Sequence, residues 1–84
     1  MVFYPSFADM RSYRFSVVVE SDKDGYFAFC PELQGCYSQG ATYEEALENI
    51  KDAIRLHVED RLAEQEEIPE PVKSISLSTI EVAV

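Results

Sequence analysis

Apolar and polar side chains alternate along residues 13–20, which is the pattern of a β-strand with one buried face. The buried face is predicted to carry Tyr13, Phe15, Val17 and Val19. A turn-forming run follows at residues 21–25, in which Asp24 and Gly25 accept the positive φ that a tight turn requires. The pattern therefore predicts an antiparallel hairpin between this strand and the next one.

Residues 26–30 form the second predicted strand, and Pro31 ends it because proline cannot donate to a β-ladder. Its two faces carry Tyr26, Ala28 and Cys30 on one side and Phe27 and Phe29 on the other. Neither face is plainly polar, and one helix layer covers only one of them. The other face is therefore expected to meet another subunit, a partner protein or the N-terminal arm. A short third strand is predicted at about residues 36–39, entered through Gly35 and left through Gly40 in a turn at positive φ.

A single long amphipathic helix is predicted after the third strand. Thr42 precedes Glu45 by three residues, the spacing at which the hydroxyl accepts a helix N–H and the carboxylate returns to the N–H of the cap. From there, apolar residues recur on one helical face as far as about Gln65. They are Tyr43, Ala46, Leu47, Ile50, Ala53, Ile54, Val58 and Leu62. Pro69 biases the residue before it away from helical backbone, so the helix should end near Glu66.

The two ends of the chain carry less regular patterns. Residues 1–12 contain aromatic side chains without a clear period and are expected to form an irregular arm or a short edge piece. Near the C-terminus, alternation shifts phase at residues 78–79, which indicates a bulge or a break. The alternating residues are Ile75 and Leu77, then Ile80, Val82 and Val84. We expect a last strand here that pairs within its own sheet or with a second copy.

The complete pattern predicts one α+β domain over residues 1–84. Its elements are a three-stranded antiparallel meander, one long helix and a C-terminal strand. A chain of 84 residues buries only about 60–65% of its unfolded surface, so self-association would add stability. Residues 1–10 lack the positive and apolar regions of a secretory signal, and no apolar run is long enough to span a membrane, so a cytoplasmic protein is expected.

Net charge narrows the class of partner. There are 16 Asp and Glu residues against 7 Lys and Arg residues, which gives a net charge of -9. Residues 42–70 hold ten of the acids and three of the bases, so they account for -7 of that total. Such a surface repels phosphate backbones, which disfavours direct binding of nucleic acid, and attracts a basic protein. The alternative is that the charge only keeps a small domain soluble.

Candidate chemistry is sparse. His57 has no Cys or carboxylate at metal-site spacing, which favours a structural histidine and no metal. Cys30 and Cys36 flank a corner and are expected to be free thiols rather than a disulfide or a zinc site. The run that starts at Glu20 imitates a calcium loop, but its twelfth position is Pro31, so a hairpin turn is the simpler interpretation. The sequence contains no catalytic triad or phosphate loop, so we expect no enzyme and no cofactor.

Four motifs in this order resemble the HicB-like family of antitoxins, also described as UPF0150-like. They are Gly25-Tyr26-Phe27-Ala28, Pro31-Glu32-Leu33-Gln34-Gly35-Cys36, Ser38-Gln39-Gly40 and Thr42-Tyr43-Glu44-Glu45-Ala46. The resemblance covers about residues 13–70. It implies a partial RNase H-like domain that forms homo-oligomers, a dimer or a tetramer, and that masks the RNA-cleaving surface of a small basic ribonuclease, HicA. Full-length members add a C-terminal DNA-binding segment, and these 84 residues show none, so operator binding is not expected.

The leading hypothesis is therefore an antitoxin-type module that binds a HicA-like mRNA ribonuclease. The expected contact residues are Asp22, Asp24, Glu32 and Glu45, with Tyr26 as an apolar anchor. One rival is a metal-dependent nuclease that uses Asp22, Asp24 and Glu32. Another is an orphan domain whose remaining property is self-association.

Overall fold

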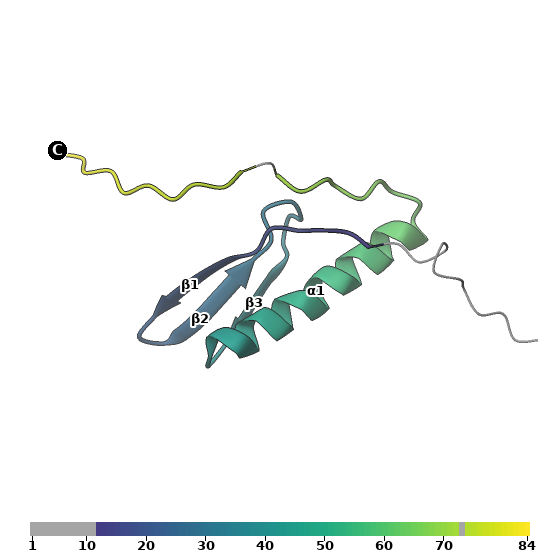
Figure 1. The fold of residues 1–84 in the computed structure, drawn as a ribbon, viewed down its shortest axis with the longest axis horizontal. Coiled ribbons are helices and arrows are strands. Elements are labelled where there is room, and N and C mark those ends of the chain that lie inside the picture. Colours follow the sequence, from purple (N-terminus) through teal and green to yellow (C-terminus); the bar gives the residue numbers. More distant parts are fainter. Residues whose placement is uncertain (1–11, 73) are drawn as a thin grey trace, which may run out of the picture.

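The computed structural model describes residues 12–72 and 74–84, so the arm predicted over residues 1–12 lies almost entirely outside the described residues. The elements are β1 (Val18–Asp22), β2 (Gly25–Phe29), β3 (Tyr37–Gly40) and α1 (Tyr43–Ala63). The three strands form one antiparallel sheet in the order β1-β2-β3, and α1 lies across one of its faces (Figure 1). This arrangement confirms the predicted meander and long helix.

The β1–β2 hairpin forms within the predicted turn run at residues 21–25, but Gly25 alone of the predicted pair takes a positive φ and Asp24 does not. Asp22 pairs with Gly25, which leaves Lys23 and Asp24 as the turn residues. Gly25 has φ +137°, a conformation that side chains disfavour, and the Asp24 N–H donates to Asp22 Oδ1 at 2.7 Å. The turn therefore takes its shape from one glycine and one short acidic side chain.

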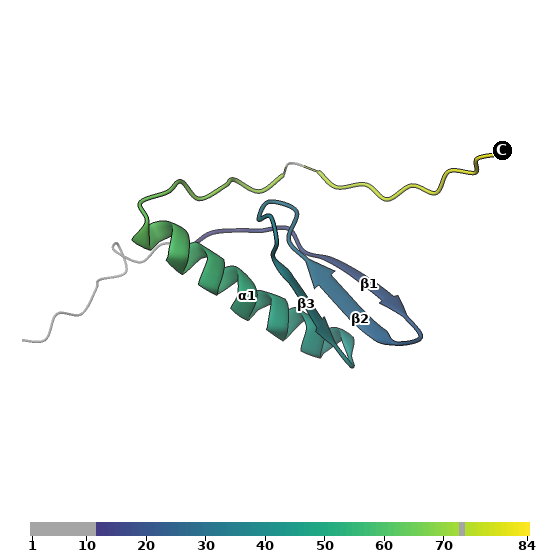
Figure 2. The same cartoon turned by 180° about the vertical axis from the view of Figure 1, so that it is seen from behind.

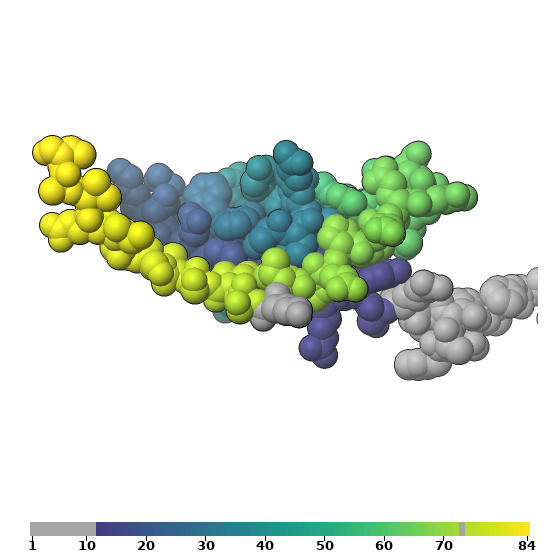
Figure 3. Space-filling model, turned by 90° about the horizontal axis from the view of Figure 1, so that it is seen from above, coloured from purple at the N-terminus to yellow at the C-terminus, as the bar shows by residue number. Residues whose placement is uncertain are grey.

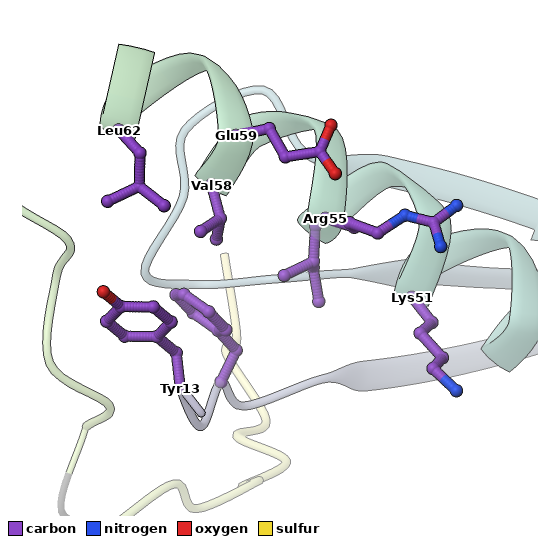
Figure 4. A pocket seen from close by; sticks show the side chains of 8 residues that line it. Tyr13, Lys51, Arg55, Val58, Glu59 and Leu62 are labelled. Atoms are coloured by element: carbon purple, nitrogen blue, oxygen red, sulfur yellow. The ribbon is translucent and has the colours of Figure 1, made fainter. Parts of the chain in front are cut away.

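The first strand begins five residues later than the alternation predicts. Its pairing starts at Val18, opposite Phe29, because the partner strand turns away at Pro31, which has no N–H to donate. Residues 13–17 continue as extended chain outside the sheet and lie beside the second half of α1. Tyr13 lines a groove of about 590 Å³ there, together with Val58 and Leu62 (Figure 4). The predicted buried face is buried only in part, since Phe15, Val17 and Val19 are each half-buried against the core.

A compact corner joins β2 to β3. The Cys30 N–H donates to the Cys36 carbonyl at 3.1 Å, and the Cys36 N–H donates to the Leu33 carbonyl at 3.3 Å. Gly35 supplies the left-handed residue that the corner needs, with φ +79°. Leu33 is only 1% exposed and points from the corner into the core. The corner therefore connects two strands and also contributes a side chain to the core.

Gly40 is required for a different reason from the one predicted. Its φ is not positive; instead, a Cβ at this position would lie 2.6 Å from the Ala46 N and 2.9 Å from Glu45. A side chain here would collide with backbone, because the end of β3 passes directly against the first turn of α1. The expected turn at positive φ is therefore wrong, and close backbone approach explains the glycine.

The start of α1 matches the predicted cap closely. Thr42 Oγ1 accepts the Glu45 N–H at 3.1 Å, as a helix N-cap does. The Glu45 carboxylate returns toward the cap but accepts the Ala41 N–H at 3.3 Å rather than that of Thr42. Both interactions fix the point at which the chain leaves β3 and enters the helix.

The helix ends at Ala63, three residues before the predicted end. Gln65 takes the left-handed conformation, with φ +59°, and its N–H donates to the Leu62 carbonyl at 3.2 Å. The Glu66 N–H then donates to the Arg61 carbonyl at 2.8 Å. These two bonds form a Schellman motif, which is usually built on glycine. The sequence pattern missed this end because glutamine gives no such signal.

The core is small and lies between the sheet, the corner and the first half of α1. Its fully buried residues are Ala28, Cys30, Leu33, Cys36, Ala46 and Ile50. Residues of the N-terminal strand and the middle of the helix surround them at partial burial. The second half of α1 is only partly covered, by residues 13–17, and Leu62 is exposed. The part of the chain that the structure describes therefore has one core, at one end of its helix.

Residues 74–84 pair with no strand of the described chain, so the predicted C-terminal strand does not join its own sheet, and its pairing with a second copy stays a prediction. From the end of α1, these residues run back past β1, as Figures 1 and 2 show from opposite sides. The space-filling view in Figure 3 shows this segment along one side of the molecule, with its last residues beyond the sheet. A β-ladder needs a neighbour at hydrogen-bonding distance, and here none is provided within one copy.

Candidate protein-interaction surface

Four of the five predicted contact residues lie together at one end of the molecule. Asp22 and Asp24 lie at the tip of the β1–β2 hairpin, and both are exposed. Tyr26 follows in β2 opposite Gly40, and Gly40 passes directly against Glu45 in the first turn of α1. Figures 1 and 2 both place the hairpin tip beside the start of α1. We use the name acidic end for Asp22, Asp24, Tyr26, Tyr43 and Glu45.

An aromatic pair gives the acidic end an apolar centre. The rings of Tyr26 and Tyr43 meet edge to face, with centroids 6.5 Å apart and planes at 77°. Tyr26 is half-buried on the face of the sheet that α1 covers, while Tyr43 is exposed. Exposed carboxylates around a partly exposed aromatic pair suit a positively charged protein surface better than a small ligand.

Glu32 does not belong to this surface. It follows β2 at the opposite end of the sheet, where its Oε1 accepts the Ser16 N–H at 2.6 Å. Its Oε2 is buried and has no hydrogen-bond partner among the described residues. The carboxylate therefore ties residues 13–17 to the corner, which is a structural role that its place in the sequence does not reveal.

The same separation bears on the rival metal-dependent nuclease. Asp22 lies four residue steps along β1 from Val18, roughly 13 Å, and Glu32 lies beyond the Val18 end of the sheet. A two-metal site holds its two ions about 4 Å apart and needs carboxylates that converge on both, and these three do not converge. Within residues 12–72 and 74–84, no group of three or more His, Cys, Asp or Glu side chains lies close enough to hold a metal ion.

The two cysteines are free and buried. Burial raises the pKa of both thiols, and the nearby Cys30 raises the pKa of Cys36 further. A thiol with a raised pKa is a poor nucleophile and a poor metal ligand. Cys30 and Cys36 therefore act as small apolar core residues. His57, the single histidine, is half-buried on α1.

The sheet has a second surface, on the side away from α1. Its register aligns Val18 with Phe29 and Tyr37 across the three strands, and Glu20 with Phe27 and Gln39 in the next row. We call these six residues the open face. The alternate residues face the helix, since Ala28 is buried and Ser38 Oγ donates to the Ala46 carbonyl at 3.0 Å.

The open face leaves aromatic side chains in solvent. Phe27 is 44% exposed and Tyr37 is 72% exposed. Alternation in the second strand already marked Phe27 and Phe29 as an apolar face without cover. Tyr37 was missed as part of that face, because its position beside Phe29 follows only from the β2–β3 register.

No helix in the described part of the chain is both long and apolar enough to cross a membrane. The outer side of α1 is charged, and its one ion pair with good geometry, Arg55 to Asp52 at 3.1 Å, is largely exposed. An exposed pair of this kind contributes little stability. The helix therefore presents solvated charge rather than a second binding site.

Residues 15–81 match a family model described as the HicB_like antitoxin of bacterial toxin–antitoxin systems. A UPF0150 protein from Synechocystis sp. is 46% identical over 69 residues, which cover 77% of this chain and 87% of that protein. A UPF0150 protein from Helicobacter pylori is 56% identical over 50 residues, which cover 60% and 69%.

One solved structure, described as the HicA3 and HicB3 toxin-antitoxin complex, resembles this fold with a TM-score of 0.58. The two chains are 23% identical, and the match covers 71% of this chain and 70% of the other. At this identity the likeness concerns the fold alone.

Proposed function

The chain belongs to the HicB-like antitoxin family, and from this premise we propose that it binds and masks a small basic ribonuclease of the HicA type. The acidic end is the proposed contact surface. The protein acts by occupying the toxin rather than by chemistry of its own, and it does so in the cytoplasm. The observation that carries this proposal is the group of exposed carboxylates of Asp22, Asp24 and Glu45 around the Tyr26–Tyr43 pair.

Electrostatics supports a basic protein as the partner. A net charge of -9 steers a positively charged protein toward this chain and repels RNA from the complex. An enzyme that cleaves RNA must present basic groups to phosphates, so carboxylates can occupy the same groups in competition with substrate. Inhibition would then follow from coverage of the RNA-binding surface.

Charged contacts and aromatic contacts are expected to contribute differently to the binding free energy. Each exposed ion pair is worth only about 0.2–1 kcal/mol, so three carboxylates give specificity and a fast encounter rather than most of the affinity. A central aromatic anchor excludes water and contributes more. Tyr43, which is exposed and held against Tyr26, is the better anchor of the two.

The proposal is tested with variants that change charge but keep the local hydrogen bonds. Asp22→Asn and Glu45→Gln retain the oxygens that accept the Asp24 and Ala41 N–H groups, so D22N/D24N/E45Q should fold as the parent does. The matched control is E59Q/D60N/E67Q, which removes three exposed charges from elsewhere. The measurement is the dissociation constant for the ribonuclease encoded beside this gene, together with inhibition of its RNA cleavage.

We expect the acidic-end variant to bind about tenfold more weakly, and the control to change by less than about threefold. Raising the salt concentration should reduce this difference, because salt screens exposed charges. Equal losses in both variants would show that overall charge acts without a defined site. No loss in either would remove the acidic end from the interface.

A further inference from the structure

The second half of α1 carries an apolar groove on the side that faces residues 13–17. The groove has a volume of about 590 Å³. Its apolar lining residues are Tyr13, Phe15, Ile54, Val58 and Leu62. A smaller groove of about 300 Å³ shares Tyr13, Phe15 and Ile54 with it and reaches Leu47. The two form one apolar strip along the helix, about 22 Å long from Leu47 to Leu62.

This strip is only partly covered by the described chain. Figure 4 shows the Val58 and Leu62 side chains pointing toward the Tyr13 ring across the groove. Leu62 is nevertheless 49% exposed, and Tyr13 and Val58 are only half-buried. A contiguous apolar surface of this kind usually has an occupant in a small protein.

The sequence just before the groove supplies an apolar candidate. Residues 1–11, which lie outside the described residues, contain Phe3, Tyr4 and Phe7, three of the ten aromatic residues of the chain. They hold one acid and one base, Asp9 and Arg11, in a protein whose net charge is -9. The many acids of α1 therefore repel this segment less than they repel most of the chain.

The point of attachment places this segment at the groove. Tyr13 lines the groove and follows Arg11 by two positions. Eleven residues can span up to about 36 Å, so a chain that turns back near Ser12 is long enough to follow the whole strip. Docking within one copy also benefits from an effective concentration on the order of millimolar, so a few apolar contacts are sufficient.

We propose that residues 1–11 occupy this groove in their own copy, with Phe3 and Phe7 against Val58 and Leu62. The two phenylalanines are four positions apart, so they face the same side in either extended or helical chain. Residues 1–14 precede the part of the chain that matches the family model, so this contact does not follow from family membership. It uses neither the acidic end nor the open face.

The test is the rate at which a maleimide alkylates a single cysteine added to the full chain. Cys30 and Cys36 are buried and have raised pKa values, so they react slowly and the added thiol can be followed by mass spectrometry. Leu62→Cys places the thiol in the groove. Leu56→Cys is the control, because Leu56 is 63% exposed on α1 and does not line the groove.

The docked segment is removed from the groove with F3S/F7S, which shortens both aromatic side chains without adding charge. These substitutions should raise the alkylation rate of L62C by about fivefold or more, because the groove then no longer has to open before reaction. The rate of L56C should change by less than about twofold. An unchanged rate at L62C would overturn the proposal.

A third position distinguishes the groove from the open face. Tyr37→Cys reports on the open face, since Tyr37 is 72% exposed there. Its alkylation rate should be the same with and without F3S/F7S. A rate that rises at Y37C instead of L62C would show that residues 1–11 cover the open face, and would overturn the proposal.

Two further readouts complete the test. The L62C rate should not depend on protein concentration, and protection that disappears on dilution would assign the contact to a second copy and contradict docking within one. Far-ultraviolet circular dichroism should show an unchanged helix in L56C, L62C and Y37C, since these residues lie outside the core. No toxin is used, so the outcome is separate from that of the proposed function.

Discussion

The first half of α1 and residues 74–84 both carry apolar side chains, but the surroundings of those side chains differ. Ala46 and Ile50 are fully buried against the sheet and the corner, whereas Ile80 and Val82 stand in solvent. The difference lies in whether one copy of the chain supplies a partner surface. Apolar residues with such a partner make the fold, and those without one are free to make an assembly. Stability and association should therefore respond to different substitutions.

The largest expected effect on stability is that of Leu33→Ala, in the corner. Leu33 is one of six buried core residues in the described part of the chain, so the cavity left by truncation should lower the free energy of unfolding by about 2–4 kcal/mol. Urea unfolding at one fixed protein concentration measures this, because self-association makes apparent stability depend on concentration.

Two controls accompany Leu33→Ala. Leu33→Met keeps most of the volume and should cost less than about 1.5 kcal/mol. Leu56→Ala, at an exposed position, should change the free energy of unfolding by less than about 0.5 kcal/mol. Equal losses at Leu33 and Leu56 would contradict the assignment of stability to the corner and the first half of α1.

Thr42→Ala should have the next largest effect. Loss of the hydroxyl leaves the Glu45 N–H without its side-chain acceptor and should lower the free energy of unfolding by about 1 kcal/mol. Thr42→Ser retains the acceptor and should stay within a few tenths of the parent. The measurement is again urea unfolding. If the two variants lose the same amount, the cap does not stabilise the helix.

The smallest predicted change is a gain, at the other end of α1. Gln65 holds the left-handed position of a Schellman motif, where glycine has no side-chain penalty. Gln65→Gly should therefore raise the free energy of unfolding by about 0.5–1 kcal/mol, after the entropy of the more flexible unfolded chain is deducted. Gln65→Ala, which retains a Cβ, should give no such gain. A loss of stability in Q65G would show that the glutamine side chain stabilises this end.

Sequence patterns predicted the fold wherever the deciding interactions are local. The hairpin turn within residues 21–25, the cap at Thr42 and the apolar stripe of α1 depend on neighbouring residues, and all three are found, although the turn residues are Lys23 and Asp24 rather than Asp24 and Gly25. The ends of elements were less predictable. Val18 begins β1 because of Pro31 on another strand, and close approach to the helix explains Gly40.

Part of the candidate surface was also predictable, because local connections bring its residues together. Asp22, Asp24, Tyr26 and Glu45 come together because short connections join their elements. Glu32 was separated from them by a contact to Ser16, sixteen residues away, that no local pattern reveals. Tyr37 joined the open face only through the register of β3. Contacts between distant segments therefore determine which residues share a surface.

The most direct test of the antitoxin role is to co-express the full chain with the genes that flank it and to weigh the purified assembly by native mass spectrometry. We predict a stoichiometric complex with a small basic protein, whose RNA cleavage returns when the complex is dissociated. The same experiment with D22N/D24N/E45Q should recover less of that partner for each copy of this chain, because binding is about tenfold weaker. An assembly that contains only copies of this chain, from the parent sequence, would contradict the antitoxin role and favour an orphan self-associating domain.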